Sequence, residues 1–144
     1  KIAQKQLISD EMRLIVPADH RWADQNHVSM KQLISEPFIL REPGSGTLKS
    51  LHQSLHDQGH MAEELNVIAE LGSNEAICQG IKNGVGVSIL STLAVAEDLQ
   101  EGKLIALKVA GLHLERNFYL TWHRHRSPSP LHQAFVKFLD EKLK

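Results

Sequence analysis

The chain has 144 residues, of which 42% are hydrophobic, enough for one ordinary core or two small lobes. Its 16 basic and 17 acidic residues give a net charge of −1, which excludes a strongly basic surface for nucleic acid. No apolar stretch is long enough to span a bilayer, and no signal-peptide pattern opens the chain. The single cysteine, Cys78, excludes an internal disulfide and fits a reducing compartment.

The first predicted elements precede a central α/β unit. Residues 12–17 (MRLIVP) indicate a strand that its proline ends. A polar turn follows, interrupted only by Trp22, and we expect this turn to be largely exposed. Ser29 and Gln32 form a capping box, so a short helix is predicted to run to Ser35.

The central unit alternates apolar runs with helical segments. Continuous apolar runs are typical of strands buried on both faces of a parallel sheet, and leucines or isoleucines share one face of each helix between them. Gly59 and Gly84 stand where these helices should end in a left-handed cap. The predicted strands are 38–40, 66–71 and 85–90, and the predicted helices are 48–58 and 74–83.

The C-terminal third predicts a helix, two strands and a last helix. They are a helix over 92–100 capped by Ser91, strands over 104–109 and 118–122, and a helix that begins at Ser129 with Pro130. The last helix carries an apolar stripe of Leu131, Phe135, Phe138 and Leu139. We expect the stripe to be covered, either by the strands at 12–17 and 118–122 or by a second copy of the chain.

Two glycine-containing turns carry the candidate binding site. In open α/β sheets ligands bind at the carboxyl edge, where both turns should lie, and free N–H groups at helix starts favour anions. One turn is PGSGT at 43–47 and the other is GSNE at 72–75. A plain capped turn explains either one alone, but the pair favours a small-ligand site. The candidate residues are Ser45, Gly46, Thr47, Gly72, Ser73 and Asn74.

Metal, cofactor and catalytic sites find little support. A solvated helix face explains His52, His56 and His60 better than a metal site, and a basic loop explains His123 and His125. The sequence around Ser45 and Ser88 lacks the glycines of a nucleophile elbow. Cys78 is predicted to be packed inside a helix rather than reactive. We therefore expect no catalytic residue, no metal and no cofactor.

Several segments, in order, resemble one family. They are DEMRLIVPADHRWA at 10–23, REPGSGT at 41–47, ELGSNEAI at 70–77, NGVGVSILS at 83–91, LAVAEDLQEGKL at 93–104 and FYLTWHRHRSPSP at 118–130. Together they resemble the effector-binding domain of LysR-type transcriptional regulators. The resemblance implies a periplasmic-binding-protein-like (type 2) α/β fold of two lobes joined by crossover strands. Residues 18–116 would be the second lobe, and residues 1–17 and 117–144 a remnant of the first.

The same resemblance implies a function. The expected role is non-enzymatic: a small anionic effector binds between the lobes and changes the oligomer on DNA, in the cytoplasm. DNA would be bound only through a helix-turn-helix domain that lies outside this chain, as would the opening of the first lobe. A lobe of a periplasmic-type solute-binding protein is the alternative, and an enzyme is the third choice. The effector, the operator and the oligomeric state stay open.

Overall fold

The computed structural model describes residues 1–143, which form two compact units. One unit consists of Lys1–Asp10 and Glu115–Lys144, and the other of Glu11–Leu114. We call them the terminal unit and the central unit. They divide near the predicted lobe boundaries but not at them, because residues 11–17 pair within the central unit. The assignment of the two units to family lobes stays a prediction.

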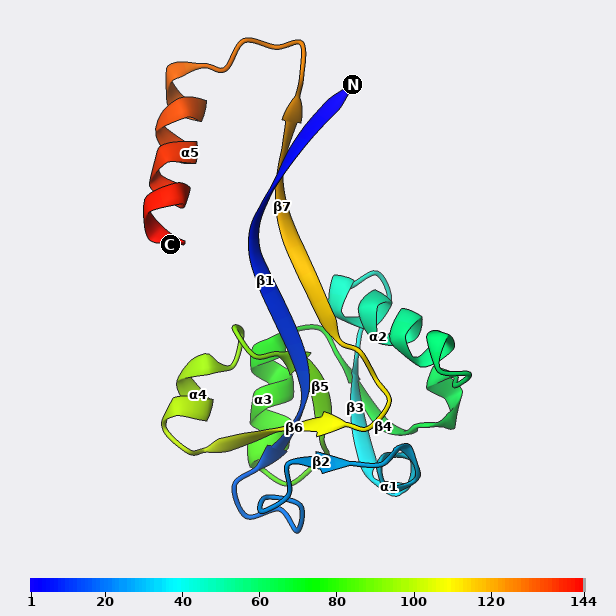
Figure 1. The fold of residues 1–144 in the computed structure, drawn as a ribbon. Coiled ribbons are helices and arrows are strands. Elements are labelled where there is room, and N and C mark those ends of the chain that lie inside the picture. Colours follow the sequence, from blue (N-terminus) through cyan, green and yellow to red (C-terminus); the bar gives the residue numbers. More distant parts are fainter. Residues whose placement is uncertain (144) are drawn as a thin grey trace. The chain divides into compact units, whose positions relative to one another are not determined.

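The central unit is built on strands that run in mixed directions (Figure 1). β1 lies between β5 and β6 and is antiparallel to both, whereas β2 runs parallel to β6. β3 and β4 form a parallel pair, and a parallel bridge between Phe38 and Val87 joins β3 to the start of β5. The strands are β1 (Ile2–Pro17), β2 (His27–Val28), β3 (Pro37–Arg41), β4 (Asn66–Leu71), β5 (Ser88–Ser91) and β6 (Leu104–Val109).

Neighbouring residues on these strands enter two separate cores, because side chains alternate across a strand. Phe38 lies in one core and Ile39 in the other. The first core contains Leu51 and Leu55 of helix α2, and the second contains Ile77 of helix α3. Helices thus cover both faces, which is the layered arrangement expected of an α/β fold. The helices of this unit are α1 (Met30–Ser35), α2 (Gly46–Asp57), the 3₁₀ turn η1 (Ala62–Glu64), α3 (Asn74–Lys82) and α4 (Ala96–Gln100).

Several local predictions are confirmed. Ser29 and Gln32 make the expected capping box at the start of α1. Gly59 and Gly84 have φ angles of 76° and 75°, the left-handed conformation that favours glycine after a helix. β6 has the predicted bounds. The helix predicted over 92–100 is shorter, because residues 92–95 form a turn and α4 begins at Ala96.

The polar turn after β1 is largely exposed, as predicted, but Trp22 and the side chain of His20 are not. Trp22 is buried in the first core. His20 Nε2 lies 2.7 Å from Glu36 Oε1, and Arg21 donates to the other oxygen of that carboxylate at 2.6 Å. The carboxylate partner is 15 or 16 residues away in sequence, so a local reading of the turn could not show it.

The prediction that all three central strands are buried on both faces is wrong for β4. Val67 and Ile68 are exposed, and only Ala69 and Leu71 pack against the second core. β4 pairs only with β3 among the described strands, so it forms an edge. β3 and β5 contribute buried residues, including Phe38, Ile39, Ile89 and Leu90.

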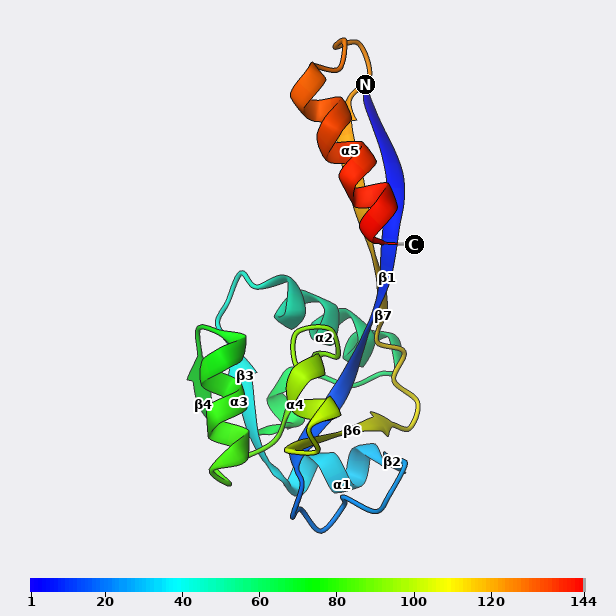
Figure 2. The same cartoon turned by 90° about the vertical axis from the view of Figure 1, so that its left-hand side faces the viewer.

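The terminal unit contains a two-stranded ribbon and one helix. β7 (Glu115–His123) pairs with β1, and the two strands run side by side in Figures 1 and 2. Asp10, whose side chain is fully buried, accepts a hydrogen bond of 2.9 Å from Arg116 across the ribbon. Helix α5 (Pro130–Lys142) begins as predicted, with Ser129 as its N-cap and proline in the first turn.

The apolar stripe of α5 is not covered by strands of this chain, which contradicts the first of the two predicted alternatives. Leu131 is 80% exposed, and Phe135 and Phe138 are each 53% exposed; only Leu139 is partly buried.

No helix among residues 1–143 is long and apolar enough to cross a membrane.

Candidate functional site

The two glycine-containing turns lie next to each other. β3 and β4 are parallel, so the turns that follow them, 43–47 and 72–75, emerge at the same end of the pair. Arg41, the last residue of β3, donates a hydrogen bond of 2.7 Å to Asn74 Oδ1 at the start of α3. A Cβ atom on Gly72 would lie 3.3 Å from Glu42 Oε2, so glycine leaves room there for that carboxylate.

Both serines of these turns cap the helix that follows. Ser45 Oγ accepts from the N–H of Leu48 at 2.9 Å, and Ser73 Oγ accepts from the N–H of Ala76 at 3.1 Å. A capping hydroxyl that accepts one hydrogen bond still has a proton to donate. Ser73 is exposed and Ser45 is partly exposed, so this proton can reach a ligand.

The first turns of α2 and α3 keep unsatisfied donors. Within residues 1–143, the N–H groups of Gly46, Thr47, Asn74 and Glu75 have no hydrogen-bond partner. Such groups at a helix start, together with the helix dipole, favour an anion. Thr47 is 8% exposed, yet its hydroxyl is unpaired among the described residues and keeps contact with solvent.

The site analysis of the sequence missed Arg41 and Glu42, which lie between the two turns. The Arg41 side chain is 16% exposed and donates to Glu42 Oε1 at 2.8 Å as well as to Asn74. These hydrogen bonds lower the pKa of the Glu42 carboxyl. An Arg–Glu pair directly after a strand, at the carboxyl edge, was the available signal. Its link to Asn74 spans 33 positions and needed the structure.

The predicted residues therefore form one group with differing roles. Asn74 is engaged by Arg41, whereas Gly46, Gly72 and Ser73 are exposed. The arrangement offers N–H donors, hydroxyl donors and one guanidinium around the carboxyl edge of β3 and β4. This set of donors suits a carboxylate or phosphate group.

The histidines at 52, 56 and 60 lie on α2 and just after it. Within the described residues, no group of three His, Cys, Asp or Glu side chains is placed to hold a metal ion. His52, His56 and His60 line a groove of about 360 Å³, and His60 Nδ1 lies 3.0 Å from Glu64 Oε2. Cys78 is 7% exposed, and burial raises the pKa of its thiol, so it is packed as predicted.

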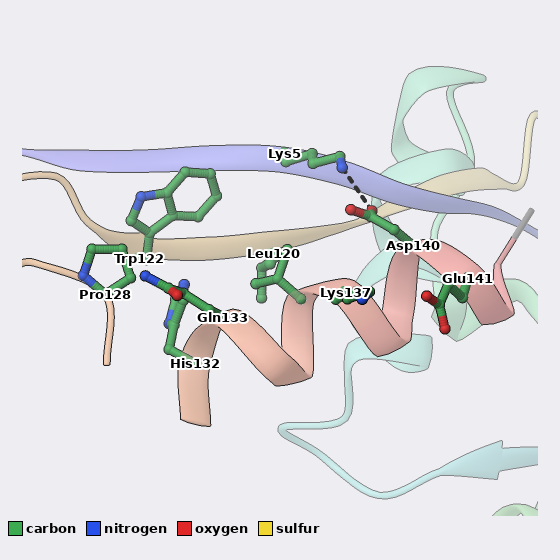
Figure 3. A pocket seen from close by; sticks show the side chains of 10 residues that line it. Lys5, Leu120, Trp122, Pro128, His132, Gln133, Lys137, Asp140 and Glu141 are labelled. Atoms are coloured by element: carbon green, nitrogen blue, oxygen red, sulfur yellow. Dashed lines mark hydrogen bonds and ion pairs between the residues drawn. The ribbon is translucent and has the colours of Figure 1, made fainter. Parts of the chain in front are cut away.

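A separate groove of about 510 Å³ lies in the terminal unit, between α5 and the ribbon (Figure 3). Trp122 and Leu120 of β7 form its apolar wall, facing α5. Lys5 and Asp140 form an ion pair of 2.7 Å beside it. This groove gathers apolar surface rather than anion donors.

The chain is a layered α/β domain in which two helix starts lie side by side at one edge of β3 and β4. The family model for the LysR substrate binding domain matches residues 1–144 of the sequence. The chain therefore belongs to that family. Its fold is accordingly the periplasmic-binding-protein-like type 2 α/β fold, as predicted.

The relatives of the chain are transcription regulators, which agrees with a non-enzymatic role. This chain is 34% identical over 126 residues to a RuBisCO operon transcriptional regulator of Acidithiobacillus ferrooxidans. The match covers 88% of this chain and 40% of the relative. It is 30% identical over 135 residues to the HTH-type transcriptional activator CmpR of Synechocystis, with 94% and 43% covered. The chain thus spans about two-fifths of the length of these relatives.

Solved structures give the same fold. The regulatory domain of CcmR from Synechocystis PCC6803, solved in complex with 2-PG, superposes with a TM-score of 0.86 at 28% identity. That comparison covers 100% of this chain and 68% of the other. The effector-binding domain of QuiR, at 16% identity, has a TM-score of 0.78 and covers 99% and 65%.

Proposed function

We propose that the chain is part of the effector-binding domain of a LysR-type regulator and that it binds a small anionic metabolite at the two adjacent turns. One observation carries the proposal: two helix starts with unpaired N–H groups meet beside Arg41 at one sheet edge. The CcmR domain, which shares the family and the fold, was solved with 2-PG, which is 2-phosphoglycolate, an anionic metabolite. The effector contacts we assign to this chain are Ser45, Gly46, Thr47, Gly72, Ser73 and Asn74.

In the whole regulator, effector binding would change how an oligomer holds DNA. The relatives named above are longer than this chain, and one of them is an HTH-type activator. DNA contact would come from a helix-turn-helix domain outside the chain, because the chain itself has a net charge of −1. A regulator that acts on DNA in this way works in the cytoplasm.

Thr47→Val tests the site with little change to the fold. Valine has the shape of threonine, and the lost hydroxyl has no partner among the described residues, so no internal hydrogen bond is broken. The loss of one hydrogen bond to a charged group costs about 1.5–3 kcal/mol. Calorimetry with 2-phosphoglycolate should therefore show at least about tenfold weaker binding.

The matched control is Thr121→Val, the same substitution at an exposed threonine on β7. It should leave the affinity and the melting temperature unchanged. Equal affinity of Thr47→Val and the unsubstituted chain would remove Thr47 from the site. Equal losses in both variants would show that the measured binding is not specific to these turns.

We further propose that copies of the chain associate through the stripe on α5. Leu131, Phe135 and Phe138 are each more than half exposed, and burying one such side chain fully stabilises by roughly 1.5–3 kcal/mol. A cluster of this kind on one helix face marks an interaction surface. Self-association also fits a regulator family that works as oligomers.

Sedimentation of the double variant Phe135→Ser, Phe138→Ser tests this interface. The unsubstituted chain should sediment as an oligomer and the variant as a monomer. The control is Val67→Ser, Ile68→Ser, which removes a similar exposed apolar pair from the edge strand β4. Dissociation by the control alone would place the interface on β4, and a monomeric unsubstituted chain would refute self-association.

A further inference from the structure

The pairing of Arg41 with its own neighbour deepens the proposed effector site. Arg41 is a cation at the junction of the two turns, and its side chain is mostly buried. Glu42 is its carboxylate partner, through Nη2 to Oε1 at 2.8 Å and a longer contact of 3.4 Å from Nε to Oε2. The guanidinium is therefore neutralised by the next residue of the chain itself.

The guanidinium nevertheless has N–H donors that are not used by Glu42 or Asn74. Arginine has five N–H donors in a fixed plane, and three of them are used by Glu42 and Asn74. Within residues 1–143 the remaining two have no partner. Asn74 holds Nη1 in place, so the plane of the group stays fixed if Glu42 leaves.

Glu42, by contrast, is easily displaced. Its side chain is 36% exposed, and Arg41 is the only other residue that the described structure shows hydrogen-bonded to it. Gly72 lies beside the Glu42 carboxylate and has no side chain. The carboxylate therefore has room to rotate away from Arg41. A carboxylate that leaves Arg41 can enter water without breaking a side-chain bond to any other residue.

We propose that Arg41 is the residue that selects an anionic effector, and that Glu42 is an internal competitor which the effector's carboxylate or phosphate displaces. This inference rests on the proposed function, since it concerns the same site. A bidentate anion would take the positions that Glu42 occupies on Arg41, while the N–H groups of Gly46 and Asn74 bind its remaining oxygens. A neutral or cationic metabolite could not compete with Glu42, so the pair sets a charge requirement.

Two substitutions with opposite expected effects test this. Glu42→Gln keeps the shape of the side chain but removes the competing charge, and it should raise affinity for 2-phosphoglycolate and for inorganic phosphate by roughly two- to fivefold. Arg41→Gln removes the selecting charge and should lower affinity at least about tenfold. In the double variant, Glu42→Gln should bring no gain, because its effect acts only through Arg41.

Calorimetry on the 144-residue chain gives the affinities, and the Arg41 Nε–H resonance in an NMR titration gives a second readout. That resonance should shift with phosphate in the unsubstituted chain and further in Glu42→Gln. Suppose that Glu42→Gln binds phosphate no more tightly than the unsubstituted chain, while Thr47→Val still weakens binding. This result would refute the competition between Glu42 and the effector, but it would not refute the proposed effector site.

The reverse outcome is also distinguishable. If Thr47→Val has no effect but Glu42→Gln tightens phosphate binding and shifts Arg41, the Arg41–Glu42 inference holds and the assignment of Thr47 fails. If neither the unsubstituted chain nor Glu42→Gln binds phosphate or 2-phosphoglycolate, both proposals fail. Tighter binding by Glu42→Gln that persists with Arg41→Gln would show a general charge effect and refute the competition.

Discussion

Gly86→Ala should strongly destabilise the central unit. A Cβ atom at this position would lie 2.8 Å from the carbonyl oxygen of Pro37 and 3.1 Å from its carbon. These are backbone atoms, and the same oxygen accepts the N–H of Val87 at 2.8 Å in the bridge between β3 and β5. The added methyl group must therefore push apart the two strands or break that hydrogen bond.

The expected cost follows from these two terms. Overpacking of a tight core costs about 1–3 kcal/mol. A lost backbone hydrogen bond adds about 0.5–1.5 kcal/mol. A total of about 1.5–4.5 kcal/mol should lower the melting temperature of a unit of about 100 residues by at least about 6 °C. Thermal and urea unfolding followed by circular dichroism measure this loss.

Gly72→Ala is the matched control. Neither glycine has a positive φ, but the Cβ atom at 72 would meet only the end of the Glu42 side chain, at 3.3 Å, and that side chain can move. The melting temperature should therefore change by no more than about 2–4 °C. Equal losses in the two variants, or no loss in Gly86→Ala, would refute the reasoning from close approach to the Pro37 carbonyl.

Three further results are expected. The Arg41 hydrogen bonds lower the Glu42 pKa below its ordinary value of 4.5. The pair therefore stabilises the fold above pH 4.5, and this effect is lost as the pH falls through the folded-state pKa. The stability difference between the unsubstituted chain and Glu42→Gln should shrink progressively as the pH falls below 4.5, and a constant difference would contradict this. Burial raises the Cys78 pKa, so a thiol reagent at pH 8 should react far more slowly with the folded chain than with the urea-unfolded one, and equal rates would show that Cys78 is accessible. Ile77→Ala removes a fully buried side chain from the second core and should cost about 2–5 kcal/mol in urea unfolding, whereas a loss below about 1 kcal/mol would mean that α3 is not anchored there.

Local signals in the sequence predicted elements well where the cause is local. The capping box of α1 lies within four residues, and the glycine after α3 depends only on its own φ. The proline that begins α5 is equally local. The order of two strand–turn–helix units then predicts adjacent turns, because parallel strands end at the same edge.

Features that depend on distant partners were not predictable in this way. The run NVIAEL is as apolar as the other strand runs, and only the pairing of β4 with β3 alone makes it an edge with Val67 exposed. Trp22 is buried by residues from several elements of the first core. The hydrogen bond from Arg41 to Asn74 joins two turns that the sequence presents separately. Turn type points to the glycines and serines of the two turns, but it carries no information about the charged pair beside them.

The most direct test of the account is an amide NMR titration of the 144-residue chain with 2-phosphoglycolate. An anion held at the two turns should produce its largest shifts at the N–H groups of Gly46, Thr47, Asn74 and Glu75, which are unpaired within the described residues. Largest shifts along the α5 groove instead, at Trp122, Val136 and Lys137, would place the ligand in the terminal unit and contradict the proposed effector site.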